Sequence, residues 1–409
     1  MIHVCFGLYD KTGRYSKFTG TAILSLFENT KSEVTVHIIH GSTVSADNRD
    51  KFTQLAERYN QRVKLYNVEE LCADKVTEMK NLLTNTFKAQ YSLAAIYRFF
   101  IPELFSPDIE KVIYLDSDII VNLDIAELWK IELNDAPLGV IPTISQNLGK
   151  DWMHWNFPMC RNKVTAFEDY FNSGVLFINL KIFRHEEKNI IDGFKFVASH
   201  SEYTFFDQDV LNYCFATRAL KLPNKFNRYV ISARSEKVPP SKNIYHYVGQ
   251  NITWSFGLDM DDPFNRLWMN YFIKTPWFDA ESIGRLYKGV QKLHVDLKQA
   301  MIQLSALMSG KARAFFALPE DIEMLKIFFS IQGNEEVILA EGQHSLQELI
   351  YAMRRSHGKK VFFIIVANFP FNVLTEAGFV NGKDFLNGIE FFSEANGMPL
   401  DSHTFLKSM

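Results

Sequence analysis

The sequence predicts an α/β fold in which a largely parallel sheet is covered by helices, with a helical extension and a small C-terminal α/β domain. Three observations indicate this fold. Strand-like and helical segments alternate through the N-terminal part of the chain, which is typical of a parallel sheet with helices on both faces. The run 111–115 is apolar without polar alternation, as expected for a central strand buried on both faces. Beyond residue 310 the alternation begins again on a smaller scale.

The N-terminal elements can be placed in order from their residue patterns. We expect strands at 2–7, 34–39 and 63–66, and helices at 19–28, 48–59 and 91–105. After the central strand, the sequence predicts a second strand at 174–180 and an amphipathic helix at 187–199. Because ligands of open α/β sheets bind beyond the carboxyl ends of strands, the residues that follow position 115 are the first candidates for a site.

The C-terminal third has a different pattern. Apolar residues recur at alternating spacings of three and four from Ile283 to Leu307, which predicts one long helix with a heptad stripe. Strands at 337–340 and 361–367 around a helix at 346–355 predict a βαβ-like unit. We therefore expect a catalytic domain at 1–276, a connecting helix at 277–310 and an accessory α/β domain at 311–409. The stripe fits docking within the chain, and a homodimer through 283–307 is the alternative.

Composition excludes several classes of protein. The 409 residues include 44 basic and 47 acidic ones, so the net charge of −3 gives no field that would attract nucleic acid. No secretory signal pattern is visible, and the longest apolar runs are too short to span a bilayer. The four cysteines lack paired spacing, which predicts reduced thiols in a cytoplasmic protein. Aromatic residues reach 14%, which suits either sugar stacking or an aromatic core, and the core is the simpler explanation.

The segment Asp116-Ser117-Asp118 carries the first chemical signal. Two carboxylates two residues apart in an extended segment project to the same side, so both can reach one cation. Such a cation can also bind a diphosphate and neutralise the charge that develops as the phosphate leaves. The alternative is a pair of turn or helix-cap carboxylates. The position directly after an apolar strand favours the metal site.

The residues around this segment resemble the metal-binding signature of the family 8 glycosyltransferases, which are retaining enzymes of the GT-A fold. Four motifs agree in order and spacing, and they occupy residues 114–121, 171–180, 207–212 and 246–249. The resemblance runs from the N-terminus to about residue 276. It implies a GT-A, Rossmann-like domain that binds a nucleotide sugar, and it does not extend to the accessory domain.

The resemblance implies a metal site and a donor site. Asp116 and Asp118 would hold the metal together with His246, and an imidazole among oxygen ligands favours Mn²⁺ over Mg²⁺, although Mg²⁺ remains an alternative. The remaining expected contacts to the UDP-sugar come from the loop after the first strand and from residues near the diphosphate. These residues are Gly7, Tyr9, Asp10, Arg98, Ser117 and Gly249. For Arg98, a structural ion pair is the alternative.

Three further residues are implied in catalysis by the resemblance. Asn172 would hydrogen-bond the donor sugar, Asp207 would bind sugar hydroxyls, and Gln208 would lie against the anomeric face opposite the leaving group. Asp207 and Asp209 also fit a helix N-terminus, and both roles are compatible. A glutamine is a poor nucleophile, so the resemblance implies front-face attack with the leaving phosphate accepting the proton of the acceptor.

Two residues depart from the family pattern. Ile252 stands where the family places a lysine aimed at the diphosphate, and Thr143 stands where a carboxylate for the donor sugar is common. The first departure bears on how the leaving group is neutralised, and the second bears on the identity of the donor sugar.

The expected activity is metal-dependent transfer of glucose or galactose from a UDP-sugar to a carbohydrate, glycolipid or glycoprotein acceptor, with retention of configuration. A nucleotide-sugar-binding subunit without transfer activity is the alternative. A nucleotidyltransferase would need a Gly-rich basic loop after the first strand, which the segment 7–10 does not resemble. We expect a cytoplasmic protein, compatible with peripheral contact at the inner face of the membrane.

Overall fold

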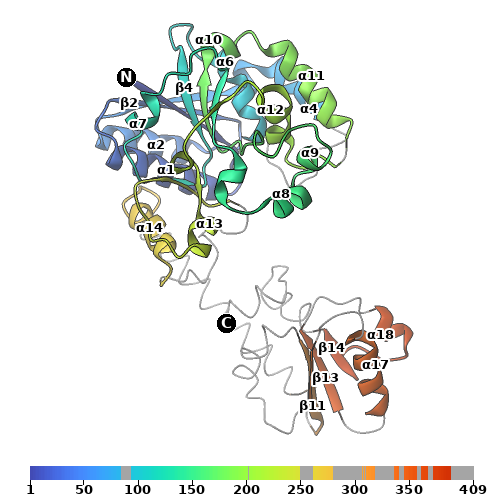
Figure 1. Cartoon of the computed structure of the whole chain (residues 1–409). Helices are drawn as coiled ribbons and strands as arrows, with labels where there is room; N and C mark the ends of the chain where they lie inside the picture. Colours follow the sequence, from blue (N-terminus) through green and yellow to red (C-terminus); the bar gives the residue numbers. More distant parts are fainter. Residues whose placement is uncertain are drawn as a thin grey trace. The chain divides into compact units, whose positions relative to one another are not determined.

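The chain forms two compact units, residues 1–279 and 280–409 (Figure 1). The computed structural model describes residues 1–83, 94–200, 202–248 and 261–279 of the first unit. In the second unit it describes residues 306, 308, 310–317, 336–339, 345–356, 361–366 and 372–387.

The first unit is built on a seven-stranded sheet in the order β3-β2-β1-β4-β7-β6-β8. Its strands are β1 (Ile2–Leu8), β2 (Val34–His40), β3 (Arg62–Asn67), β4 (Lys111–Leu115), β6 (Leu138–Val140), β7 (Val175–Asn179) and β8 (Leu220–Lys221). The pairs β3-β2, β2-β1 and β1-β4 are parallel. The α/β class and the five strands expected in this unit are confirmed.

Strand β7 departs from the parallel arrangement, because it runs antiparallel to both of its neighbours, β4 and β6. Its first residue therefore lies at the edge of the sheet where β4 ends, and the backbone N–H of Asp116 donates to the carbonyl of Gly174 over 2.9 Å. The reversed strand thus brings the segment 172–174, far away in the sequence, beside Asp116 and Asp118.

Helices cover both faces of this sheet, as expected. They are α1 (Arg14–Asn29), α2 (Ala46–Arg58), α3 (Val68–Leu71), α4 (Ala73–Leu83), α5 (Ala94–Tyr97), α6 (Ile101–Leu104), α7 (Ala126–Trp129), α8 (Lys150–Asn156), α9 (Pro158–Arg161), α10 (Leu180–Phe183), α11 (Glu187–Ala198), α12 (Phe206–Phe215), α13 (Val230–Ser235) and α14 (Pro263–Phe272). The segment expected as one helix at 91–105 is divided in its described part into α5, a 3₁₀ turn (Arg98–Phe100) and α6. Pro102 lacks the N–H that a continuous helix would use.

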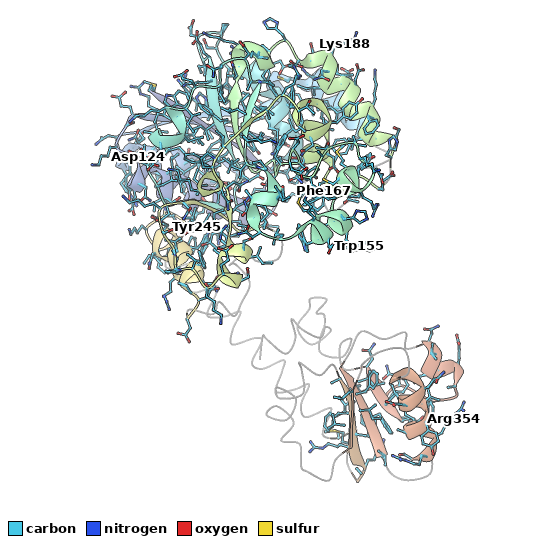
Figure 2. All side chains as sticks on the ribbon, in the orientation of Figure 1. Asp124, Trp155, Phe167, Lys188, Tyr245 and Arg354 are labelled. Atoms are coloured by element: carbon cyan, nitrogen blue, oxygen red, sulfur yellow. The ribbon has the colours of Figure 1, made fainter. Side chains whose placement is uncertain are left out.

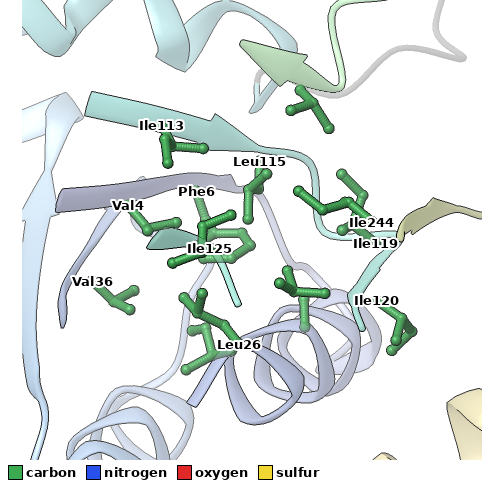
Figure 3. Close-up of a cluster of buried hydrophobic side chains, with 14 of the residues drawn as sticks. Val4, Phe6, Leu26, Val36, Ile113, Leu115, Ile119, Ile120, Ile125 and Ile244 are labelled. Atoms are coloured by element: carbon green, nitrogen blue, oxygen red, sulfur yellow. The ribbon is translucent and has the colours of Figure 1, made fainter. Parts of the chain in front are cut away.

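The core consists of two apolar layers, one on each face of the sheet. Val4 and Phe6 of β1 point into the layer covered by α1, α2 and α14 (Figure 3), whereas Cys5 points into the layer covered by α4, α11 and α12. In β4, Ile113 and Leu115 point into the first layer, whereas Val112 and Tyr114 point into the second. This confirms that β4 is buried on both faces. Figure 2 shows Tyr245 inside the unit and Lys188 projecting outward from α11.

A second, three-stranded sheet has the order β5-β10-β9, with β5 (Ile119–Val121), β9 (Arg228–Tyr229) and β10 (Ile244–His246). Strand β9 was not predicted from the sequence, because a strand of two residues leaves no periodic pattern. β10 pairs antiparallel with β5 and places His246 opposite Ile119. The backbone N–H of Tyr247 donates to the carbonyl of Asp118 over 2.9 Å, which extends this pairing to the end of β4.

The second unit contains a parallel four-stranded sheet in the order β12-β11-β13-β14. Its elements are β11 (Ala312–Ala317), β12 (Glu336–Leu339), α17 (Ser345–Arg355), β13 (Val361–Val366), α18 (Asn372–Glu376) and β14 (Phe385–Asn387). The βαβ unit expected here is confirmed. The heptad stripe at 283–307 lies, apart from residue 306, outside the described residues. Within the described part of the chain, no helix combines the length and apolarity needed to cross a membrane.

Candidate active site

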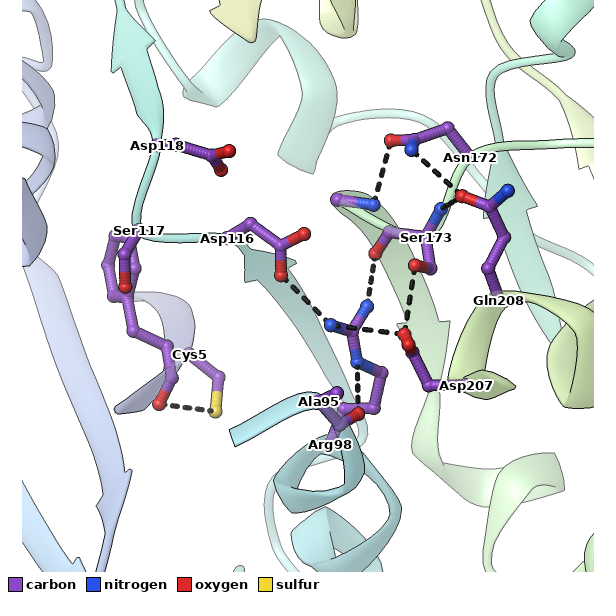
Figure 4. Close-up of polar contacts among 12 residues, drawn as sticks. Cys5, Ala95, Arg98, Asp116, Ser117, Asp118, Asn172, Ser173, Asp207 and Gln208 are labelled. Atoms are coloured by element: carbon purple, nitrogen blue, oxygen red, sulfur yellow. Dashed lines mark hydrogen bonds and ion pairs between the residues drawn. The ribbon is translucent and has the colours of Figure 1, made fainter. Parts of the chain in front are cut away.

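A cavity of about 660 Å³ opens at the edge of the main sheet where β1 and β4 end. Most of the residues expected at a site line it, and they come from both sheets and from α12. The expected residues in its lining are Gly7, Tyr9, Arg98, Asp116, Ser117, Asp118, Asn172, Asp207, Gln208 and His246. Figure 4 shows the polar contacts among several of them.

Asp116, Asp118 and His246 meet at one point. A ligand atom of each lies within 4.8 Å of the others, which is close enough for one metal ion to contact all three. His246 is buried, and its Nε2 lies 3.1 Å from Oδ1 of Asp118. The structure thus brings together the three residues that the sequence predicted as metal ligands.

Asn227 orients this histidine, and the sequence analysis did not identify it. The amide Nδ2 of Asn227 donates to Oδ1 of Asn172 over 3.0 Å, so its own Oδ1 is left to accept from Nδ1 of His246, also over 3.0 Å. With the proton of the ring on Nδ1, Nε2 carries the lone pair that a metal needs, and it faces Asp118. The residues present therefore fit a divalent cation. A single asparagine in an irregular segment gave no sequence signal for this role.

The electrostatics agree with a cation site. Burial raises the pKa of Asp116 above its ordinary value, Arg98 opposes this shift, and the neighbouring Asp118 adds to it. Burial lowers the pKa of His246, but the carboxylates of Asp118 and Asp116 outweigh it and raise the pKa above the ordinary value. Negative charge is therefore concentrated in a partly buried place where a metal ion would relieve it.

Gly174 is required by this arrangement. A Cβ at this position would lie 2.1 Å from Cε1 of His246 and 2.8 Å from its Nδ1. The motif glycine thus leaves the space into which the imidazole fits.

Gln208 is held by hydrogen bonds on both sides of its amide. Its Oε1 accepts from Nδ2 of Asn172 over 2.9 Å and from the backbone N–H of Ser173 over 3.2 Å (Figure 4). Its Nε2 donates to the hydroxyl of Tyr170 over 2.8 Å, and that hydroxyl donates to Asp209 over 2.8 Å. Tyr170 lies one residue before the 171–180 motif, and its role was not predicted from the sequence.

Asp207 and Gln208 lie in the first turn of α12, as expected for residues at a helix N-terminus. Asp207 accepts a hydrogen bond from the hydroxyl of Ser173 over 3.0 Å, and it lies 3.3 Å from the guanidinium of Arg98. Asp209, further along the same turn, is completely buried, and burial raises its pKa to about 7.

Arg98 is buried and fully engaged by protein groups. Its guanidinium donates to Oδ1 of Asp116 over 2.9 Å and to the carbonyl of Ser173 over 2.5 Å (Figure 4). It also lies 4.3 Å from the ring centre of Tyr114. The residue lines the cavity, but the ion pair that the sequence analysis left as an alternative is present.

The remaining expected positions divide into three groups. Tyr9, Gly7 and Ser117 line the cavity, and the hydroxyl of Ser117 lies 2.8 Å from that of Thr19. Asp10 is not in the lining, because its carboxylate accepts the backbone N–H groups of Ser16 and Thr12 and shapes the β1–α1 loop. Gly249 and Ile252 lie outside the described residues.

Thr143 is buried beside the active-site network and is not in the lining of the cavity. Its backbone N–H donates to the carbonyl of Tyr170 over 2.8 Å. In this structure the residue therefore supports the segment 170–174 and does not face the cavity as a donor-sugar carboxylate would.

Comparison with known proteins agrees with this geometry. The lipopolysaccharide 1,3-galactosyltransferase of Salmonella typhimurium is 25% identical over 268 residues, which cover 63% of this chain and 74% of the relative. The probable glycosyl transferase Gly of Streptococcus gordonii is 28% identical over 179 residues, 42% of this chain, and the chain spans only 23% of that relative.

Among solved structures, the galactosyltransferase LgtC has the same fold, with a TM-score of 0.52 at 19% identity, covering 69% of this chain and 99% of LgtC. The bifunctional glycosyltransferase WbbM also gives a TM-score of 0.52 at 19% identity, covering 70% of this chain and 51% of WbbM. The model of glycosyl transferase family 8 matches residues 8–256, a range that contains Asp116, Asp118, His246, Gln208 and the whole described lining of the cavity except Gly7. The chain belongs to glycosyl transferase family 8.

Proposed function

We propose that this protein transfers glucose or galactose from a UDP-sugar to a carbohydrate, glycolipid or glycoprotein acceptor, with a divalent metal and with retention of anomeric configuration. The observation that carries the proposal is the position of the Asp116–Asp118–His246 group in the same cavity as the amide of Gln208. As the family resemblance implies, transfer needs both features in one cavity: a metal site for the diphosphate and a polar side chain beside the sugar.

When bound, the metal would neutralise the charge that develops on the diphosphate. Two carboxylates and one imidazole favour Mn²⁺, with Mg²⁺ as the alternative. Arg98 and Asn227 would hold Asp116 and His246 in position, so that these ligands need not reorganise when the metal arrives.

The chain's own residues would orient the donor. Tyr9 and Ser117 line the part of the cavity next to Asp116 and would contact the nucleotide, while Asn172 and Asp207 would hydrogen-bond the sugar. Gln208 offers an amide whose oxygen already accepts two hydrogen bonds, which makes it a poor nucleophile. As the family resemblance implies, the acceptor would attack on the face that the phosphate leaves, and the departing phosphate would accept the proton of the acceptor hydroxyl.

The names of the relatives support an oligosaccharide or glycolipid acceptor. The Salmonella relative is called a lipopolysaccharide 1,3-galactosyltransferase, and an Escherichia coli relative that is 24% identical is called a lipopolysaccharide 1,2-glucosyltransferase. A lipid-linked acceptor would place the enzyme in the cytoplasm at the inner face of the membrane.

The direct test is to incubate the full chain with Mn²⁺ and a panel of UDP- and GDP-sugars and to follow release of the nucleoside diphosphate. We expect release from UDP-glucose or UDP-galactose, and loss of release with a chelator and in Asp118→Asn. An Asp118→Asn variant that is folded and fully active in chelator would contradict the metal site. Nucleotide binding without any release from the parent protein would instead favour a nucleotide-sugar-binding subunit. Proton NMR of the product distinguishes retention from inversion.

A further inference from the structure

The lining of the cavity has two chemically different parts. The charged residues described above form one part, and the other is an apolar wall contributed by α8 (Lys150–Asn156) with its flanking residues, by the residue that precedes α12 and by α13 (Val230–Ser235). Apolar side chains of this wall line the cavity: Leu148, Trp152, Phe157, Phe205 and Ile231. Trp152 and Phe205 remain 40% and 36% exposed, although large aromatic side chains are normally covered in a core.

Three of these rings form a connected group, which we call the aromatic shelf: Trp152, Phe157 and Phe205. Phe157 is buried, and its ring centre lies 5.5 Å from that of Trp152 and 5.4 Å from that of Phe205. The two exposed rings are therefore fixed by a buried one between them. Rigid aromatic faces bind a flat ligand with little loss of conformational entropy.

The shelf is in contact with the residues that hold Gln208. Phe157 also packs on Tyr170, with ring centres 4.5 Å apart, and the hydroxyl of Tyr170 accepts the hydrogen bond from Gln208. Phe205 precedes Gln208 by three residues, and its backbone N–H donates to Asp209. A molecule on the shelf would thus lie beside the point where the donor sugar is expected.

We propose that the aromatic shelf binds a sugar ring of the acceptor and that Trp152 is a determinant of acceptor specificity. The inference rests on the proposed transferase function. A sugar ring has an apolar C–H face for the aromatic rings and a polar rim, and the exposure of Trp152 and Phe205 leaves that rim in contact with water. Asn156, which also lines the cavity, donates from Nδ2 to the carbonyl of Trp152 over 2.8 Å, and its Oδ1 can accept from a sugar hydroxyl. An acyl chain has no atom that could form a hydrogen bond with this amide.

Trp155 supplies a matched control on the same helix. It is 74% exposed on the surface of the unit (Figure 2) and is not part of the cavity lining, and its ring centre lies 5.7 Å from that of His154. Trp152→Ala and Trp155→Ala remove the same side chain three residues apart, and Trp152→Phe keeps an aromatic face at the shelf.

The probe is octyl β-lactoside, kept below its micelle concentration, with the full chain, Mn²⁺ and UDP. Saturation-transfer NMR then reports which protons of the probe touch the protein, and it needs no turnover. We expect saturation of the sugar C–H protons with the parent protein, Trp152→Phe and Trp155→Ala, and its loss in Trp152→Ala. Saturation of the octyl chain alone would show an apolar occupant and overturn the proposal, as would unchanged sugar signals in Trp152→Ala or none with the parent protein.

Kinetics provide the second measurement. With an acceptor that the parent protein uses, Trp152→Ala should raise the KM for the acceptor about tenfold, the factor expected for loss of one aromatic stacking contact. The affinity for UDP, measured by calorimetry, should stay near that of the parent. A folding defect would instead weaken the binding of UDP as well as that of the acceptor. Equal acceptor KM values for Trp152→Ala and Trp155→Ala would overturn the proposal. Absence of UDP release from the parent protein would instead contradict the proposed function.

Discussion

The side-chain amide of Gln208 donates a hydrogen bond to the hydroxyl of Tyr170 over 2.8 Å, and this bond decides which way the amide faces. The hydroxyl donates its own proton to Asp209, so it must accept from Nε2 of Gln208. Oε1 is then directed to Asn172 and to the backbone of Ser173. A buried tyrosine and a buried acid thereby fix the orientation of the residue expected at the anomeric centre.

The first prediction concerns Tyr170→Phe. The variant keeps the ring that packs on Phe157 but removes the hydroxyl, so Gln208 and Asp209 each lose a buried partner. We expect a loss of about 1–3 kcal/mol in the free energy of unfolding and a fall of roughly tenfold or more in kcat. Urea denaturation and steady-state kinetics measure the two effects. Tyr213→Phe, at a 40% exposed position of α12, should leave both near the parent values. A parent-like kcat in Tyr170→Phe would show that the amide needs no such support.

The second prediction concerns the pH dependence of stability at Asp209, whose pKa burial raises to about 7. The ordinary value is 3.8, so between about pH 4 and 7 the folded protein binds this proton more tightly than the unfolded chain. Its contribution to stability is complete below pH 4 and is lost as the pH rises through 7. A pKa difference of one between the folded and unfolded states corresponds to about 1.4 kcal/mol, so the loss is on the order of 4 kcal/mol.

Asp209→Asn isolates this contribution, because the amide does not titrate. The substitution removes one of two accepted hydrogen bonds, from Tyr170 or from the backbone of Phe205, at every pH. We expect the stability of the parent protein relative to the variant to fall between pH 4 and pH 8 in urea titrations. A difference that stays constant across this range would mean that Asp209 is ionised throughout.

The third prediction concerns Gly174→Ala. The new methyl group would overlap the ring of His246, so the imidazole must leave the position that faces Asp118. We expect Mn²⁺ affinity to fall at least tenfold, because metal ligands that lose their supporting geometry bind the ion less tightly. Calorimetric titration with Mn²⁺ checks this.

Gly193→Ala is the matched control for Gly174→Ala. Its Cβ would lie 2.6 Å from Sγ of Cys214, so it also creates a buried clash, but in α11 and away from the cavity. It should lower the melting temperature without changing Mn²⁺ affinity. Equal Mn²⁺ affinity in Gly174→Ala and in the parent protein would contradict the assignment of His246 as a ligand.

Much of the sheet could be predicted because long buried strands have strong patterns. β1, β2 and β4 each bury nearly every residue, and an apolar run of this kind is hard to mistake in an alternating α/β sequence. The direction of β7 could not be predicted, since an apolar run reads the same in both directions. The short strands β9 and β10 were also missed, although β10 carries His246, because two or three residues show no periodicity.

Site residues that belong to a motif could be predicted from the sequence. Residues that only orient another site residue could not. Asp116 and Asp118 were found from their spacing directly after an apolar strand, and Gln208 and His246 were found through the family resemblance. Asn227, which orients His246, and Tyr170, which orients Gln208, lie outside the four motifs, 19 and 38 residues away in the sequence from the side chains that they hold. Such contacts depend on how the loops pack, and single-residue patterns do not record this. The same argument applies to Asp10, whose role in shaping the β1–α1 loop follows from its backbone contacts.

The last prediction separates the two roles considered for Arg98. Its guanidinium serves Asp116, Asp207 and the carbonyl of Ser173 at once, and it lies against the face of Tyr114. A lysine keeps the charge but has one point of attachment, so it cannot hold both carboxylates. If Arg98 acts by positioning Asp116, Arg98→Lys should weaken Mn²⁺ binding as well as donor binding.

Arg98→Met removes the charge altogether and leaves the buried Asp207 and the partly buried Asp116 without their cation. We expect it to reduce the free energy of unfolding by about 3–5 kcal/mol, more than Arg98→Lys does. Added Mn²⁺ should restore part of this stability, because the metal supplies positive charge next to Asp116. Thermal unfolding of both variants with and without Mn²⁺ measures this. If Arg98→Lys keeps the parent's Mn²⁺ affinity and raises only the KM for the donor, the guanidinium contacts the UDP-sugar directly and the positioning role is wrong.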